Sequence, residues 1–147
     1  MTILALDLGT STGYAMQTAD GDILSGSVSF KQTRFDGGGV RFLRFKKWLT
    51  EIKQSGVTEV YYESVRRHVS NDSAHCYGAF MGILTAWCEH HEIPYTGVPV
   101  GTIKKHATGK GNASKEQMIQ AAIDKGFSPK THDEADAIHI LLYSIKG

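Results

Sequence analysis

The hydrophobic residues of the first thirty positions form short runs separated by turns. Apolar residues are nearly continuous from Ile3 to Leu8 and end at Gly9, a pattern typical of a buried central strand. The turn Thr10-Ser11-Thr12 and the polar segment Asp20-Gly21-Asp22 separate this run from two further apolar segments. Strands joined by such short turns pair antiparallel. The pattern therefore predicts a three-stranded meander with strands at 3–8, 13–16 and 23–30.

The rest of the chain alternates helical and strand patterns. Apolar residues recur at helical spacing between Gly39 and Gly56 with basic residues among them, which predicts a helix with a basic outer side. A longer helix, rich in small and apolar residues, is predicted over 71–91. Capping-box sequences begin at Ser114 and Thr131 and predict helices over roughly 115–125 and from 131 onward. Apolar runs predict two more strands, at 57–62 and 93–98. This order predicts one mixed α/β domain spanning residues 1–147.

Composition limits the function mainly by exclusion. Sixteen Lys and Arg against fifteen Asp and Glu leave a net charge of +1, so the total charge does not indicate a protein that binds polyanions. Basic residues are nevertheless concentrated in segments 31–70 and 104–115, which could follow a phosphate backbone. The two cysteines, Cys76 and Cys88, lack metal-binding spacing. The first apolar run is broken by Asp7, and no stretch approaches the ~20 apolar residues of a membrane span. We expect a soluble cytoplasmic protein without a membrane partner.

Four acidic residues lie at positions that call for a structural or functional explanation. Asp7 falls inside an apolar strand, where an uncompensated carboxylate is costly. Glu63 ends the fourth predicted strand and would share a sheet edge with Asp7 if the two strands lie parallel. Asp133 and Asp136 are three residues apart, on one face of the last predicted helix. Such an oxygen-rich set suits Mg²⁺ or Mn²⁺. Two ions about 4 Å apart would promote phosphodiester hydrolysis.

Taken alone, each carboxylate has a plainer interpretation. Asp7 could form a turn, and Glu63 could be a solvated strand end. The pair on the last helix could be there because the helix dipole favours acidic residues in the first turn. Only their joint placement favours a metal site. The nearby His132 and His139 could move a proton or contact a phosphate, but we expect them to be surface or capping residues.

Four segments span nearly the whole chain: residues 3–14, the strand that ends in Glu63, residues 100–115, and the sequence Asp133-Glu134-Ala135-Asp136-Ala137. Together they resemble RuvC-type Holliday-junction resolvases. It implies a ribonuclease H-like fold, a mixed five-stranded sheet flanked by helices. It also implies a homodimeric endodeoxyribonuclease that makes paired symmetric nicks in a four-way DNA junction. Each active site would use two Mg²⁺ ions, for which Mn²⁺ can substitute.

The resemblance also assigns roles to individual residues. The implied catalytic metal ligands are Asp7, Glu63, Asp133 and Asp136. The residues expected to contact DNA are Lys104, Lys115, Arg66, Arg67 and Lys110. Helix 71–91 is similar to the helix that forms the dimer interface in the family. Its candidate interface residues, which at helical spacing are more often core than interface, are Cys76, Ala79, Phe80, Ile83 and Trp87. The loop after Glu63 lacks the aromatic residue that the family inserts at the junction centre. The short, divergent chain suits a phage or prophage relative.

The sequence is also compatible with other functions. Residues 7–13 are also similar to the first phosphate loop of actin-like sugar kinases, but those enzymes bind ATP between two domains, and a chain of 147 residues offers only one. A ribonuclease H-like nuclease that cuts other branched DNA, flaps or RNA/DNA hybrids is not distinguished by the order of elements. A junction-binding scaffold without turnover is disfavoured because all four acids are present.

Overall fold

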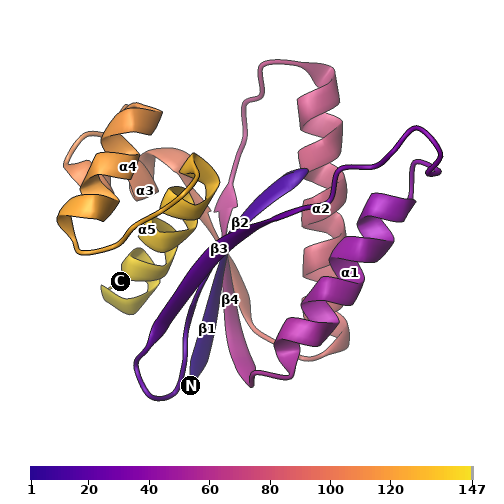
Figure 1. Cartoon of the computed structure of the whole chain (residues 1–147), viewed down its shortest axis with the longest axis horizontal. Helices are drawn as coiled ribbons and strands as arrows, with labels where there is room; N and C mark the ends of the chain where they lie inside the picture. The colour runs from indigo at the N-terminus through magenta and orange to yellow at the C-terminus, as the bar shows by residue number, and fades with distance from the viewer. Residues whose placement is uncertain (147) are drawn as a thin grey trace.

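The computed structural model describes residues 1–146 (Figure 1). The strands are β1 (Thr2–Asp7), β2 (Ser11–Gln17), β3 (Ile23–Ser29), β4 (Val57–Ser64) and β5 (Tyr95–Pro99). The helices are α1 (Val40–Lys53), α2 (Asn71–His90), α3 (Val100–Thr108), α4 (Lys115–Asp124) and α5 (His132–Lys146). Within residues 1–146, no helix combines the length and apolar character needed to cross a membrane.

The strands form one mixed sheet in the order β3-β2-β1-β4-β5. β1 pairs antiparallel with β2, and β2 with β3, whereas β4 lies parallel to β1 and β5 parallel to β4. Figure 1 shows α1 and α2 on one face of the sheet and α3, α4 and α5 on the other. The predicted mixed five-stranded α/β sheet is therefore confirmed.

The two helical layers explain why the first strand is apolar at nearly every position. Leu4 and Leu6 pack into the core beneath α1 and α2, whereas Ile3 and Ala5 pack into the core beneath α5. A strand covered on both faces has no solvent-facing side. Asp7 ends this strand at the sheet edge where the buried run stops.

Residues 100–108, which the sequence pattern did not assign to a helix, form α3. This segment contains a glycine and several β-branched residues, which lower helix propensity. Tertiary packing compensates, because Ile103 and Ala107 are buried against the core under α5. Gly109 ends the helix with a φ of 85°, a left-handed conformation that glycine adopts without strain. α3 thus carries Lys104 on an ordered element.

Candidate metal centre and active site

Three of the four predicted carboxylates come together at one edge of the sheet. Asp7 and Glu63 lie at the carboxyl ends of the parallel strands β1 and β4, one residue beyond the Leu6–Tyr62 pair. Asp136 reaches them from the first turns of α5. One carboxylate oxygen from each of these three residues lies within 4.8 Å of the others. This spacing allows a single cation to contact all three side chains.

The close approach of α5 to β2 sets the position of Asp136. Gly13 of β2 pairs with Asp7 of β1, and a Cβ atom at Gly13 would lie 1.9 Å from the backbone oxygen of Asp133. The first turn of α5 therefore rests directly on the backbone of β2, next to the strand position of Asp7. A glycine at this position allows the contact.

Glu134 fixes the same helix end from the side, and it is not part of the carboxylate cluster. Its side chain is buried, and its two oxygens accept hydrogen bonds from the Ser25 hydroxyl of β3 (2.7 Å) and the Lys130 backbone N–H (3.0 Å). The Thr131 hydroxyl accepts a hydrogen bond from the Glu134 backbone N–H (3.1 Å). The predicted cap at Thr131 is therefore present, although the Glu134 carboxylate binds the neighbouring backbone N–H of Lys130 instead of returning to Thr131.

Asp133 lies beside the cluster without joining it. Among residues 1–146, the group of oxygens that could share one ion contains Asp7, Glu63 and Asp136 only. Asp133 instead pairs with the half-exposed His132, whose Nε2 atom is 3.1 Å from its carboxylate. Both residues line the cavity that holds the other three acids, so Asp133 is within reach of a ligand in that cavity.

The electrostatics of the cluster favour a bound cation. Burial, reinforced by repulsion from Glu63, Asp136 and Asp133, raises the pKa of Asp7 well above its usual range. Burial, followed by repulsion from Asp136, raises the pKa of Glu63 to about 7. Burial also raises the pKa of Asp136 to about 6, against the opposing charges of His132 and Lys104. Clustered carboxylates cannot all ionise cheaply without a positive charge. An all-oxygen donor set fits a hard divalent cation such as Mg²⁺.

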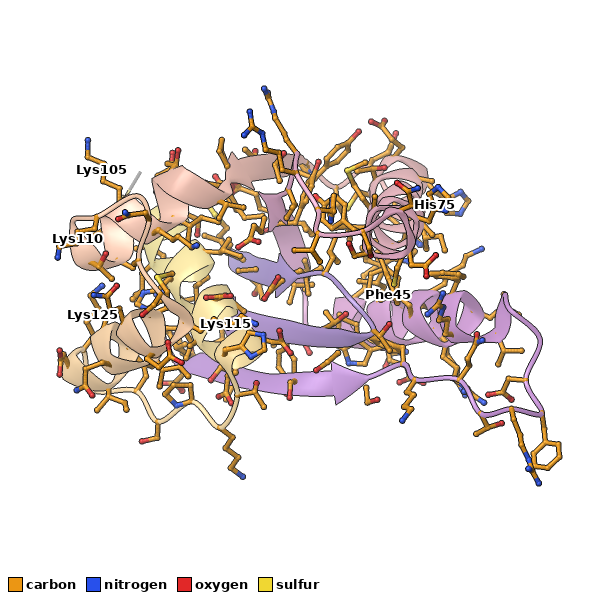
Figure 2. The ribbon with its side chains drawn as sticks, turned by 90° about the horizontal axis from the view of Figure 1, so that it is seen from above. Phe45, His75, Lys105, Lys110, Lys115 and Lys125 are labelled. Atoms are coloured by element: carbon orange, nitrogen blue, oxygen red, sulfur yellow. The ribbon has the colours of Figure 1, made fainter. Side chains whose placement is uncertain are left out.

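Two of the five predicted DNA-contacting residues lie at this cluster. Lys104 of α3 and Lys115 of α4 line, with the carboxylates, a cavity of about 290 Å³ that we call the lysine cavity. In Figure 2, Lys115 lies over the yellow ribbon of α5, close to the strands, whereas Lys110 lies toward the outer end of α3. Lys110 lines a separate hollow between α3 and α4, and the exposed Arg66 and Arg67 line another beside the end of β5.

A second hollow adjoins Asp7 and Glu63 from the side of α1 and α2. This groove of about 880 Å³, which we call the arginine groove, is also lined by Thr10, Arg41 and several residues of α2. Sequence reasoning treated Arg41 as one basic residue of a helix face and did not single it out. The two acids at the strand ends thus separate the lysine cavity from the arginine groove.

Tyr77 is a further residue that sequence reasoning missed. Its side chain is buried, its hydroxyl donates a hydrogen bond to the backbone oxygen of Glu63 (2.7 Å), and it accepts one from the backbone N–H of Val65 (3.2 Å). These bonds hold the end of β4 to α2 at the residue that carries the Glu63 carboxylate. Helical periodicity predicted only that this side of α2 packs inward.

The expectation that His139 is a surface or capping residue is wrong. His139 is fully buried, and its Nε2 atom lies 2.8 Å from the backbone oxygen of Met118. The last helix turns this position onto the same buried face as Ala135 and Ile138. Burial lowers the pKa of His139, so the side chain joins α4 to α5 as a neutral group.

Comparison with known proteins identifies the family of the chain. A crossover junction endodeoxyribonuclease RuvC from Dehalococcoides mccartyi is 30% identical over 149 residues, covering 97% of this chain and 89% of the relative. This chain belongs to the RuvC family. The RuvC of Anaeromyxobacter sp. is also 30% identical, over 94% of this chain and 69% of the relative. No family profile matches the chain.

Solved RuvC structures share the fold. Thermus thermophilus RuvC in complex with a Holliday junction substrate superposes with a TM-score of 0.78 at 20% identity, covering 97% of this chain and 91% of that one. The yeast mitochondrial Holliday junction resolvase gives a TM-score of 0.61 at 14% identity, covering 94% of this chain and 75% of that one. The RuvC resemblance and the ribonuclease H-like fold expected from the sequence are both confirmed.

Proposed function

We propose that this RuvC-family protein is a metal-dependent endodeoxyribonuclease that resolves four-way DNA junctions by paired symmetric nicks. The observation that carries the proposal is the cluster of Asp7, Glu63 and Asp136, whose oxygens lie within 4.8 Å of one another. The relatives are named crossover junction endodeoxyribonucleases, and a structural neighbour was solved with a Holliday junction substrate. Both the site and the family support cleavage of branched DNA.

In this proposal the four acids hold two Mg²⁺ ions, for which Mn²⁺ can substitute. The cluster of Asp7, Glu63 and Asp136 supplies the shared ligands, and Asp133 supplies a further carboxylate on the same cavity. When bound, two ions would activate a water molecule and stabilise the leaving oxygen of a phosphodiester. The protein's own contribution is to fix these oxygens on two strand ends and one helix, which are rigid supports.

The basic residues act on the DNA backbone. Lys104 and Lys115 face the carboxylates across the lysine cavity, where they would attract the phosphate that is cut and offset its charge. The exposed Arg66, Arg67 and Lys110 would contact phosphates further away. Phosphate contacts position DNA without reading its sequence.

Paired nicks require two active sites, and we assign the second site to a second copy of the chain. Of the candidate interface residues on α2, Phe80 and Trp87 are buried in the core of the same chain. Small residues occupy the outer side of α2, where Cβ atoms added at Gly78 and Gly82 would meet no atom of residues 1–146 within 4 Å, the backbone of the helix itself aside. Such a surface lets two helices approach closely. We expect a dimer in sedimentation at micromolar concentration and a monomer for Gly82→Arg.

The function is tested with labelled four-way junctions, duplexes, flaps and RNA/DNA hybrids, incubated with and without Mg²⁺. We expect paired symmetric nicks confined to the junction and dependent on metal. Preference for flaps or hybrids would keep the active site but change the substrate. Asp7→Asn should abolish cleavage while keeping junction binding, because it removes one metal ligand and some repulsion of phosphate. Asp20→Asn, at an exposed turn, is the matched control. Cleavage by Asp7→Asn at the normal rate would refute the assignment.

A further inference from the structure

We propose that Arg41 and Thr10 form a second phosphate-binding site in the arginine groove, and that this site holds a backbone phosphate of the strand that is cut. The inference rests on the proposed function, since it places part of the same substrate. It differs from the lysine contacts, because Arg41 and Thr10 lie on the opposite side of Asp7 and Glu63 from the lysine cavity.

Among residues 1–146, Arg41 has no carboxylate partner. Its Nη1 atom is 3.5 Å from the Thr10 hydroxyl, a long hydrogen bond, and its Nε atom is buried with no hydrogen-bond partner in the same part of the chain. The guanidinium carbon lies 4.9 Å from the centre of the Phe42 ring, which restricts the side chain to the groove. Buried donors in proteins are normally paired, so an orphaned one indicates a missing acceptor.

Arg44, one turn further along α1, shows the alternative arrangement. Its two terminal nitrogens lie 3.1 and 3.4 Å from the two carboxylate oxygens of Asp36. Within residues 1–146, Arg41 forms no such pair with a carboxylate. Arginine stays charged at every accessible pH, and its planar fork matches a phosphate. The unpaired arginine that faces a groove next to metal ligands is therefore suited to an anionic substrate group.

Thr10 fixes the site relative to the metal centre. It lies three residues after Asp7, and its backbone oxygen accepts a hydrogen bond from the Phe30 backbone N–H (2.7 Å). The Thr12 hydroxyl donates to the backbone oxygen of Gly9 (2.6 Å) and braces the same turn. These bonds fix the backbone of the turn that carries Thr10, whose side chain lines the same groove as Asp7 and whose hydroxyl lies 3.5 Å from the Cys76 Sγ atom as well as from Arg41. A phosphate held between Thr10 and Arg41 would belong to a strand whose cut phosphate lies at the carboxylates.

The start of α1 adds positive potential to this groove. The helix follows Gly37-Gly38-Gly39, has no side-chain cap, and carries no acidic residue in its first turn. The Val40 and Phe42 backbone N–H groups already donate to the Gly37 and Gly39 carbonyl oxygens, so the helix contributes mainly through its dipole, which favours an anion near Arg41. Asp72 is the one other acid on the lining besides the two metal ligands, and His68 and His75 also line the groove. Figure 2 shows His75 on the outer side of α2.

The test compares Arg41→Gln with Arg44→Gln, which makes the same charge change on the same helix. Junction affinity is measured across a range of salt concentrations in EDTA, where cleavage is absent. Because Arg41→Gln removes one phosphate contact, the log of the junction affinity should fall less steeply with the log of the salt concentration, with a slope smaller in magnitude by about one. Affinity near physiological salt should fall about tenfold, with a loss below about threefold for Arg44→Gln. Thr10→Val should give a smaller loss in the same direction. Thermal unfolding checks that each variant is folded.

Phosphate-ethylation interference locates the contact on the DNA. Ethylation of one phosphate near the cleavage site on the cut strand should weaken binding by the wild-type protein and leave Arg41→Gln unaffected. The proposal is overturned if Arg41→Gln behaves like Arg44→Gln, or if the affected phosphate lies on an uncut strand. If the wild-type protein does not bind junctions at all, the proposed function fails. Normal wild-type cleavage with unaltered binding by Arg41→Gln rejects only the second phosphate site.

Discussion

Gly13→Ala tests whether the contact between β2 and α5 sets the geometry of the metal centre. The added methyl carbon would lie 1.9 Å from the backbone oxygen of Asp133, 2.3 Å from its carbonyl carbon and 2.9 Å from the Glu134 nitrogen. Real Cβ atoms essentially never approach closer than 3.0 Å. Because all three obstructing atoms are backbone, no side chain can rotate away. The first turn of α5 must therefore retreat from β2 by about 1 Å.

This displacement acts on stability and on catalysis to different degrees. Overpacking of this kind costs about 1–3 kcal/mol of unfolding free energy. The same shift carries Asp136 away from Asp7 and Glu63, which remain on their strands. A misplacement of about 1 Å at a reacting centre can reduce the rate about 100-fold. We therefore expect a folded protein whose cleavage rate falls far more than its stability.

Urea unfolding and single-turnover cleavage of a labelled junction measure the two effects. Gly101→Ala is the control, because its added methyl group meets only one atom, at 3.9 Å, and alanine favours a helix by up to about 1 kcal/mol over glycine. It should keep the wild-type rate and gain slight stability. Wild-type cleavage and stability in Gly13→Ala would refute the role given to this contact.

Three further predictions concern groups around the cluster. Without metal, the free energy of unfolding should fall as pH rises from 4.5 to about 7, because burial raises the pKa of Glu63 to about 7 and its ionised form is disfavoured in the folded state. Urea unfolding in EDTA at a series of pH values measures this fall in the free energy of unfolding. The same fall in saturating Mg²⁺ would contradict the metal assignment. Tyr77→Phe should lower the free energy of unfolding by about 1–2 kcal/mol and weaken Mn²⁺ binding measured by calorimetry. The control is Tyr61→Phe, which also removes a hydrogen bond of 2.7 Å and should leave the Mn²⁺ affinity unchanged. Glu134→Ala should lower the free energy of unfolding by about 2 kcal/mol, because it removes the hydrogen bonds that the buried carboxylate accepts from the Ser25 hydroxyl and the Lys130 backbone N–H. A melting temperature equal to that of the wild type would exclude this role.

The fold followed from the sequence where burial leaves a local pattern. A strand covered on both faces is apolar at successive positions, and 3–8 showed this directly. The helix at 100–108 left no such pattern, because its Gly101 and β-branched residues disfavour a helix in isolation. It forms because Ile103 and Ala107 bury against elements distant in sequence. Local propensity carries no information about that packing.

The candidate metal ligands were recognisable because their placement is unusual when taken together, with Asp7 and Glu63 at the ends of apolar strands and Asp133 and Asp136 on one helix face. The residues that position them were not, since their roles depend on contacts across the fold. Gly13 matters because Asp133 lies against it, 120 residues later in the numbering. Tyr77 matters because its hydroxyl meets the backbone oxygen of Glu63. In the sequence, Gly13 is one glycine among many, and Tyr77 is one aromatic residue of a predicted helix.

The three acids of the last helix show why a sequence cannot by itself sort ligands from supports. Asp133, Glu134 and Asp136 lie within four residues, and each could bind a cation. The helix turns Glu134 about 100° away from Asp133, toward β3. There its oxygens meet the hydrogen-bond donors of Ser25 and Lys130. The Asp136 oxygens meet other carboxylate oxygens instead. A carboxylate that faces donors is already satisfied and holds the fold, whereas one that faces further oxygens binds either a proton or a cation, and the bound cation is what the proposed chemistry uses.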